Sequence, residues 1–173
     1  EWIVKGAGEN FHLPSNTIDV GKSGSTLYFF TPVASVFEGK SIFTGDESIC
    51  KRPVNHLLDA LRQLGAFAQT TRKGIDAPPF EVIGPIKAGK VTTDGRLSQY
   101  ISGLMMASTL LDGKLEIELT DPKETPYLTM TQIWLKSVGF DVEISPNFKK
   151  ISAQGPHKIK AFEKIIPSDW EGV

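Results

Sequence analysis

Residues 53–65 read PVNHLLDALRQLG, and residues 126–139 read PYLTMTQIWLKSVG. Each stretch begins with a proline, whose missing N–H is not needed in the first turn of a helix. Each ends with a glycine, which easily takes the left-handed conformation that follows a last turn. The apolar side chains on one helical face of the first stretch are Val54, Leu57, Leu58, Leu61 and Leu64. The proline-to-glycine spacing is 12 residues in one stretch and 13 in the other, which predicts an internal repeat.

Strand patterns surround the first stretch. Residues 17–20, 41–43, 66–70 and 80–83 are typical of short strands bounded by turns that contain glycine or proline. Between the first two strands, a stripe of apolar residues at helical spacing consists of Leu27, Phe30, Ala34 and Phe37. Pro32 lies within that stripe, so we expect a kinked helix or one that begins late. These elements together make one βαβαββ unit.

The same order recurs roughly 70 residues later. Residues 90–93 and 115–119 have strand character, and the second of these alternates between apolar and polar side chains. Residues 142–144 and 149–154 are expected to form a closing hairpin. The helical stripes are Ile101, Leu104, Met105, Ser108 and Leu111 in one helix, and Met130, Ile133, Trp134 and Val138 in the next. The sequence therefore predicts an α/β fold built from two βαβαββ units.

We expect four parts along the chain. The two units occupy residues 17–86 and 87–155, residues 1–16 resemble the closing hairpin of a preceding unit, and residues 156–173 resemble the start of a crossover to another domain. A repeat of this size covers the apolar face of a neighbour. The chain is thus expected to be part of a larger protein, and the missing domain or self-association would cover the apolar surface that two units leave exposed.

The composition excludes several classes of protein. The 173 residues are 40% hydrophobic and 23% charged with a net charge of −1, which is ordinary for a globular protein and offers no basic stripe for nucleic acid or a membrane surface. The longest apolar-leaning stretch, residues 100–111, is too short to span a bilayer. Cys50 is the only cysteine, so no internal disulfide or Cys/His metal cluster is expected. A reducing, cytoplasmic compartment fits best, and no cofactor or metal is expected.

The expected helices should begin at a common edge, because a right-handed crossover starts each helix at the carboxyl end of the preceding strand. Helix N-termini present unpaired N–H groups and partial positive charge, so this edge is suited to anions. We expect the functional positions at residues 21–25, 48–53, 95–99 and 124–127.

Single residues at that edge allow more than one interpretation. Gly21-Lys22-Ser23 is not a P-loop, because Asn16 stands where the first glycine would be required. The turn at 21–25 is either a tight strand-to-helix connection or a backbone cradle for a phosphate or carboxylate. Ser98 could be a helix cap or a ligand contact, and Tyr127 could belong to the core or line a site.

Four sequence segments together resemble the 5-enolpyruvylshikimate-3-phosphate synthase family. They are Gly21-Lys22-Ser23-Gly24-Ser25-Thr26-Leu27, Arg52-Pro53 with the helix that follows it, Asp94-Gly95 with Ser98-Gln99-Tyr100, and Thr125-Pro126-Tyr127. The resemblance spans nearly the whole chain in the correct order. It implies an inside-out α/β barrel of βαβαββ units, and an enzyme that moves the enolpyruvyl group of phosphoenolpyruvate onto shikimate 3-phosphate, in the biosynthesis of chorismate and aromatic amino acids. It also implies that a fragment without the second domain does not catalyse.

The resemblance implies substrate-binding roles for individual residues. Ser98 and Gln99 would contact shikimate 3-phosphate, with Gln99 also near phosphoenolpyruvate, and Tyr127 would lie against the shikimate ring. Gly24 would bring the backbone close to phosphoenolpyruvate, where the herbicide glyphosate also binds. The same turn would be lined by Lys22, Ser23 and Ser25. No catalytic residue, metal or cofactor is implied for this part of the enzyme.

The chain departs from the family pattern at four binding positions. Tyr28 and Ser48 stand where the pattern has arginines, and Leu97 and Glu124 stand where it has serines. Glu124 would place a negative charge opposite a phosphorylated sugar. Two alternatives therefore stay open: a non-catalytic homologue or subunit, and a UDP-N-acetylglucosamine enolpyruvyl transferase.

Overall fold

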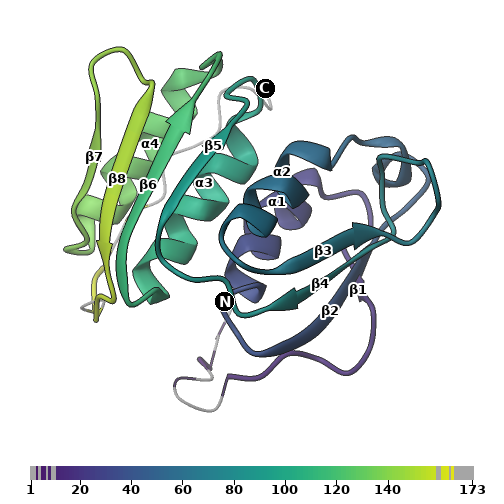
Figure 1. The fold of residues 1–173 in the computed structure, drawn as a ribbon. Coiled ribbons are helices and arrows are strands. Elements are labelled where there is room, and N and C mark those ends of the chain that lie inside the picture. Colours follow the sequence, from purple (N-terminus) through teal and green to yellow (C-terminus); the bar gives the residue numbers. More distant parts are fainter. Residues whose placement is uncertain are drawn as a thin grey trace.

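The computed structural model describes residues 3, 5, 6, 8, 11–158, 161–163 and 165. It contains two four-stranded sheets, with strand orders β1-β2-β4-β3 and β5-β6-β8-β7, which lie side by side (Figure 1). The first unit consists of β1 (Ile18–Asp19), α1 (Gly24–Ala34), β2 (Gly39–Thr44), the 3-10 helix η2 (Ile49–Lys51), α2 (Asn55–Gln63), β3 (Phe67–Thr70) and β4 (Phe80–Gly84). The second consists of β5 (Lys90–Thr93), α3 (Ser98–Ala107), the 3-10 helix η3 (Ser108–Leu110), β6 (Gly113–Leu119), α4 (Thr125–Ser137), β7 (Val142–Ile144) and β8 (Lys150–Gly155). The predicted α/β fold with a repeated βαβαββ order is confirmed.

The two sheets have the same internal geometry. In each, the first two strands pair in parallel, β1 with β2 and β5 with β6. The strands of the closing hairpins pair antiparallel, β3 with β4 and β7 with β8. The antiparallel pair of β2 with β4 has the same register as that of β6 with β8 at its glycine end, where Gly39 faces Gly84 and Gly113 faces Gly155. Gly39 and Gly113 both have φ near +120°, which favours glycine. The repeat is thus a repeat of backbone geometry.

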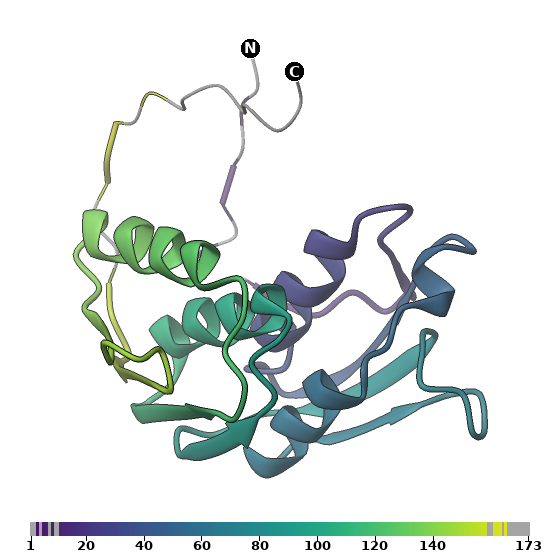
Figure 2. The same ribbon diagram turned by 90° about the horizontal axis from the view of Figure 1, so that it is seen from above.

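The two units meet through α1 and α3. Seen from above, α3 lies between α1 and α4, and the second sheet runs below α3 and α4 in that view (Figure 2). At Gly103 of α3, a Cβ atom would lie 2.5 Å from the carbonyl oxygen of Tyr28 and 3.0 Å from Pro32 of α1. Pro32 has no N–H to donate to the carbonyl of Tyr28, so Gly103 can pack directly against that carbonyl. Gly103 therefore sets the close approach of the two helices.

We expected α1 to be kinked or to begin late, and the prediction of a late start is wrong. The helix begins at Gly24, directly after the turn, and Pro32 is accommodated in its last turn. Ser23 caps the helix: its hydroxyl oxygen accepts a hydrogen bond from the N–H of Thr26 at 3.1 Å. A capped first turn holds the start of the helix in place, so the proline affects only the C-terminal end.

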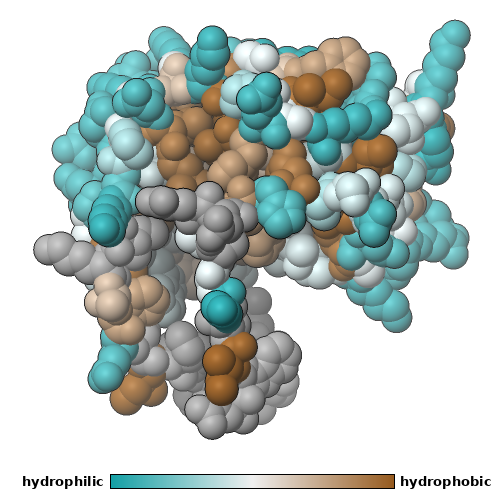
Figure 3. All heavy atoms as spheres, turned by 90° about the horizontal axis from the view of Figure 1, so that it is seen from below, coloured by the Kyte–Doolittle hydropathy of each residue, from teal (hydrophilic) through white to brown (hydrophobic). Residues whose placement is uncertain are grey.

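The predicted apolar stripes are buried to different extents in the structure. All five apolar residues of the α2 stripe are buried, as predicted. Phe30 and Ile133, however, are each 59% exposed and Met130 is 49% exposed, whereas Leu128 and Leu135 of α4 are buried. These helices cover the sheets with narrower faces than the stripes suggested. Apolar side chains also gather in one area of the surface seen from below (Figure 3).

The ends of the chain form no regular strand in the described residues among 1–16 and 156–165. The predicted hairpin at 1–16 and the expected start of a crossover at 156–173 both fall partly outside the described residues. Among the described residues, no helix is both long and apolar enough to cross a bilayer.

Candidate functional site

A cleft of about 530 Å³ lies where the helix N-termini of both units meet. The residues that line it are Ser25, Phe29, Arg52, Leu97, Ser98, Gln99, Ser102, Glu124, Tyr127, Met130 and Thr131. They come from α1, from the segment before α2, from α3, and from the N-terminal half of α4 with the residue before it. Segments more than 70 residues apart thus share one cleft, as the crossover geometry predicted.

The turn before α1 brings backbone close to a cation. Gly21 has φ +57°, and its N–H donates to the Asp19 carboxylate at 2.8 Å. The chain then enters α1 at Gly24, where a Cβ atom would lie 2.7 Å from Nη1 of Arg52. The absence of a side chain at Gly24 is what allows the guanidinium to lie against the helix start.

Arg52 lies within the expected functional range 48–53, but it was not singled out as a site residue from the sequence. The resemblance to the family pattern directed attention to Ser48 as the place of a binding arginine. Ser48 instead donates a hydrogen bond to the Asp46 carboxylate at 2.7 Å and is not among the lining residues. Arg52 could have been found from its position directly before the proline that opens the second helix, at the expected anion-binding edge. A guanidinium can bind a carboxylate or phosphate through two parallel hydrogen bonds.

The start of α3 binds a carboxylate of the protein itself. The backbone N–H and the hydroxyl of Ser98 both donate to Oε2 of Glu124, at 3.0 and 2.9 Å. Ser98 is only 2% exposed, and its side chain does not cap the helix, whose N-cap residue is Leu97. The interpretation of Ser98 as a helix cap is therefore wrong, because its hydroxyl serves as a donor to an anion.

One hydrogen bond across the cleft joins the two units. Nε2 of Gln99 donates to Oγ of Ser25 at 3.0 Å. Ser25 is the second residue of α1 and Gln99 is the second residue of α3, so equivalent positions of the repeat face each other. A neighbouring bond from Thr131 Oγ1 to Ser102 Oγ, at 2.8 Å, fixes α4 against α3. The cleft is thus held by polar contacts between helices.

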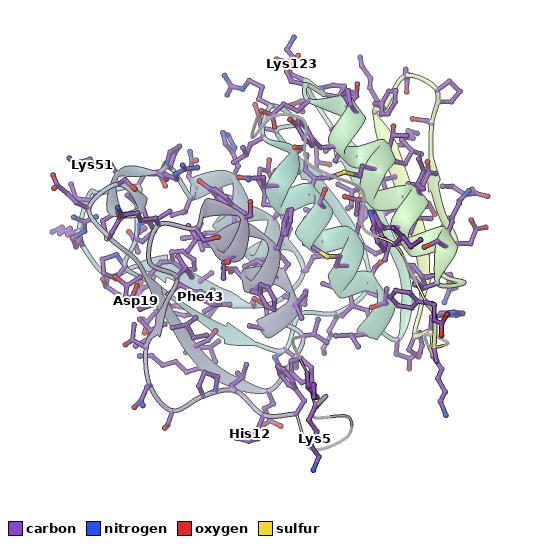
Figure 4. All side chains as sticks on the ribbon, turned by 180° about the vertical axis from the view of Figure 1, so that it is seen from behind. Lys5, His12, Asp19, Phe43, Lys51 and Lys123 are labelled. Atoms are coloured by element: carbon purple, nitrogen blue, oxygen red, sulfur yellow. The ribbon has the colours of Figure 1, made fainter. Side chains whose placement is uncertain are left out.

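The remaining predicted site residues divide into two groups. Tyr127 lines the cleft and is 42% exposed, so it is not a core residue. Lys22 and Ser23 belong to the turn before α1 but are not among the residues that line the cleft. Lys51 and Lys123, which precede Arg52 and Glu124, point away from the body of the molecule (Figure 4). Among the lining residues, Arg52 is the one cation and Glu124 the one anion.

The other departures from the family pattern have structural roles. Tyr28 is buried, and its hydroxyl donates to the carbonyl oxygen of Pro53 at 2.9 Å. Burial raises the pKa of Tyr28, partly offset by the positive charge of Arg52. Leu97 lines the cleft with an apolar side chain and offers no hydrogen bond there. Within the described residues, no three His, Cys, Asp or Glu side chains are grouped as a metal site would need.

The comparisons with known proteins agree on one family. A family model described as EPSP synthase (3-phosphoshikimate 1-carboxyvinyltransferase) matches residues 1–171. The 3-phosphoshikimate 1-carboxyvinyltransferase of Acetivibrio thermocellus is 36% identical over 170 residues, which cover 98% of this chain and 40% of the relative. That of Methanococcus maripaludis is 36% identical over 173 residues, which cover 98% of this chain and 39% of the relative. The chain therefore spans about two-fifths of the length of these relatives.

The solved structure of EPSP synthase from Acinetobacter baumannii matches with a TM-score of 0.72 at 27% identity. The match covers 85% of this chain and 32% of that chain. Sequence and structure thus lead to the same result, and the alternative of a UDP-N-acetylglucosamine enolpyruvyl transferase is not the family that they indicate. The chain belongs to the EPSP synthase (3-phosphoshikimate 1-carboxyvinyltransferase) family.

Proposed function

We propose that the chain forms part of the substrate-binding domain of an enolpyruvyl transferase, and that its cleft holds phosphoenolpyruvate next to an acceptor of the shikimate 3-phosphate type. One observation carries this proposal: the starts of α1 and α3, joined by the bond from Gln99 to Ser25, share a cleft with the guanidinium of Arg52. Amide dipoles and a cation together form the kind of site that binds carboxylate and phosphate groups.

The donor half of the site would be built around Gly24 and Arg52. Phosphoenolpyruvate carries a carboxylate and a phosphate, and Arg52 can pair with either through a fork of two N–H groups. The open backbone at Gly24 leaves room for the ligand beside the guanidinium. Lys22 and Ser23 would act through the turn that positions Gly24, rather than by lining the cleft.

The acceptor half would be built by the second unit. Gln99 offers a side-chain amide to hydroxyl groups of the acceptor, and Ser25 offers a hydroxyl from the opposite helix. Tyr127, at the cleft wall, offers a ring face to the acceptor's carbocycle. Ser98 would contact the acceptor only where Glu124 releases it.

Binding by the chain itself tests this proposal. Isothermal titration of the 173-residue chain with phosphoenolpyruvate, shikimate and shikimate 3-phosphate should give saturable binding of the donor and of at least one acceptor. Arg52→Gln should weaken phosphoenolpyruvate binding by about 10- to 100-fold, because a charge-assisted bond of about 1.5–3 kcal/mol is lost. Lys51→Gln is the matched control, since Lys51 points away and pairs with Glu47. Absence of binding by the donor and by both acceptors would overturn the proposal.

The chain alone is not expected to catalyse. Glu124 is the one carboxylate among the cleft-lining residues, and its Oε2 already accepts hydrogen bonds from Ser98. Mixing the chain with phosphoenolpyruvate and either acceptor should release no phosphate above the rate without protein. Measured turnover would contradict this expectation. The activity would belong to the protein with its other domain, acting in the cytoplasm.

The exposed apolar residues of α1 and α4 suit a protein partner. We infer that they contact either the rest of the parent protein or a second copy of the chain. Sedimentation of the chain over a range of concentrations distinguishes these cases, because a second copy gives a concentration-dependent rise in mass and the rest of the parent protein does not.

A further inference from the structure

The two units carry opposite charges at equivalent places beside the cleft. In the first unit Arg52, which precedes α2, lies against Gly24, the first residue of α1. In the second unit Glu124, which precedes α4, accepts hydrogen bonds from Ser98, the first residue of α3. The cleft is therefore lined by one cation at the start of α1 and one anion at the start of α3, and a negatively charged ligand group is attracted by the first and repelled by the second.

The Glu124 carboxylate uses the donors that an anionic ligand would need. A helix N-terminus attracts anions through unpaired N–H groups and partial positive charge. At α3, which has ten residues, the N–H and the hydroxyl of Ser98 are both directed to Oε2 of Glu124. A phosphate that approached this end would meet a carboxylate already bonded to those donors, and like charges at such distance repel each other.

The position of Glu124 is set by the backbone. It has φ +48° and ψ +33°, a left-handed conformation that few residues other than glycine adopt. Its carbonyl oxygen accepts the N–H of Tyr127 at 3.1 Å, in the first turn of α4. The side chain is thereby aimed across the loop at α3, while the residue as a whole remains exposed at the mouth of the cleft.

We propose that Glu124 is a specificity-determining residue that selects an acceptor with a free hydroxyl over the same acceptor with a phosphate at the α3 end of the cleft. A hydroxyl can donate a hydrogen bond to the carboxylate, whereas a phosphate dianion cannot. The inference rests on the proposed function, because it concerns which shikimate-class acceptor occupies that cleft. It makes the ratio of two affinities, rather than binding itself, the quantity that Glu124 controls.

The test compares shikimate with shikimate 3-phosphate on the full 173-residue chain by isothermal titration. The unsubstituted chain should bind shikimate at least as tightly as shikimate 3-phosphate. Glu124→Gln removes the charge and keeps the length, and it should tighten shikimate 3-phosphate binding by about 10- to 100-fold while changing shikimate binding by less than about threefold. Glu124→Asn, which tolerates the left-handed backbone and cannot span the same distance, should act in the same direction.

Glu143→Gln is the matched control. Glu143 lies exposed on β7, so this variant makes the same change in net charge away from the cleft and should leave both affinities unchanged. The inference is overturned if shikimate 3-phosphate binds the unsubstituted chain more tightly than shikimate, or if neither Glu124 variant changes the ratio of affinities. In both of those outcomes the cleft still binds acceptor, so the proposed function stands. If every variant fails to bind phosphoenolpyruvate and both acceptors, the proposed function fails and the inference fails with it.

Discussion

The first unit has a cation at the start of its first helix, and the second unit has an anion at the equivalent place. The main features of the backbone are the same in the two units: the strand order, the pairing of Gly39 with Gly84 and of Gly113 with Gly155, and the crossover direction. The side chains at the shared edge differ, as Arg52 and Glu124 show. Steric constraints can therefore give both units the same framework while the side chains that face the cleft differ in charge.

Glycines at equivalent positions explain why the two units have the same backbone framework. A Cβ at Gly84 would lie 2.4 Å from the carbonyl oxygen of Phe37, and one at Gly155 would lie 2.2 Å from that of Ser108. At both places the last strand of a unit ends against carbonyls at the end of its first helix, so no larger residue fits. The edge that bears Arg52 and Glu124 is open to the cleft, so packing does not dictate the side chains there.

The largest expected effect comes from separating the units. Gly103→Val should lower the free energy of unfolding by about 3 kcal/mol, because the added atoms overlap the carbonyl of Tyr28 and the ring of Pro32. Urea denaturation measures the loss, and the bond from Gln99 to Ser25 should weaken with it. Gly89→Val is the control, since a Cβ at Gly89 has no other atom within 4 Å. Equal stability of the two variants would show that the close approach of α1 and α3 is not a tight joint.

Tyr28 in the first unit and Tyr100 in the second are both buried, so their effects on stability at high pH allow the two units to be compared. Burial raises the pKa of Tyr100 from 10.0 to about 12, and the Asp94 charge adds to the effect, while its hydrogen bond with Thr93 opposes it. Because the folded pKa lies above the unfolded one, this stabilisation is complete below pH 10 and is lost as the pH rises from 10 to 12, by about 2 kcal/mol. Tyr100→Phe should remove that part of the alkaline loss in urea denaturation at pH 9 and pH 11.5.

Tyr28 provides the matching measurement in the first unit. Burial raises its pKa too, but the nearby charge of Arg52 acts in the opposite direction. Tyr28→Phe should therefore flatten the alkaline loss less than Tyr100→Phe does. A steeper alkaline loss in the Tyr100→Phe variant than in the parent chain would contradict the assignment of this pH dependence to Tyr100.

The smallest expected effect on the free energy of unfolding comes from the hydrogen bond between Gln99 and Ser25, which occupy equivalent positions of the two units. A double-mutant cycle with Gln99→Ala and Ser25→Ala should give a coupling energy of about 0.5–1 kcal/mol in the free energy of unfolding, as a neutral hydrogen bond between partly exposed groups does. Because Thr131 and Ser102 hold α4 and α3 independently, Thr131→Ala should be additive with either change. A coupling indistinguishable from zero would mean that the bond from Gln99 to Ser25 does not help to hold the two units together, and that the bonds between Gln63 and Thr92 and the packing of α1 on α3 do so instead.

Much of the fold followed from local sequence patterns. Four features were predicted correctly from the sequence, because local turns and one-sided burial impose their patterns. They are the two proline-to-glycine helices, the buried stripe of α2, the strand at residues 90–93 and the alternation in β6. The failures were Phe30, Met130 and Ile133, which fit a helical stripe and yet are exposed. Periodicity identifies an apolar face but not the neighbour that covers it.

The sequence by itself determined the repeat and the helix starts at one edge, and it predicted that this edge binds anions, because these features depend on crossover handedness and on backbone groups that every residue carries. Only the tertiary structure decided that Arg52 lies against Gly24, that Gln99 meets Ser25, and that the donors of Ser98 are bonded to Glu124. These contacts join residues up to 74 positions apart. Which residues meet in these contacts depends on how the two units pack together, and a local sequence pattern does not predict that packing.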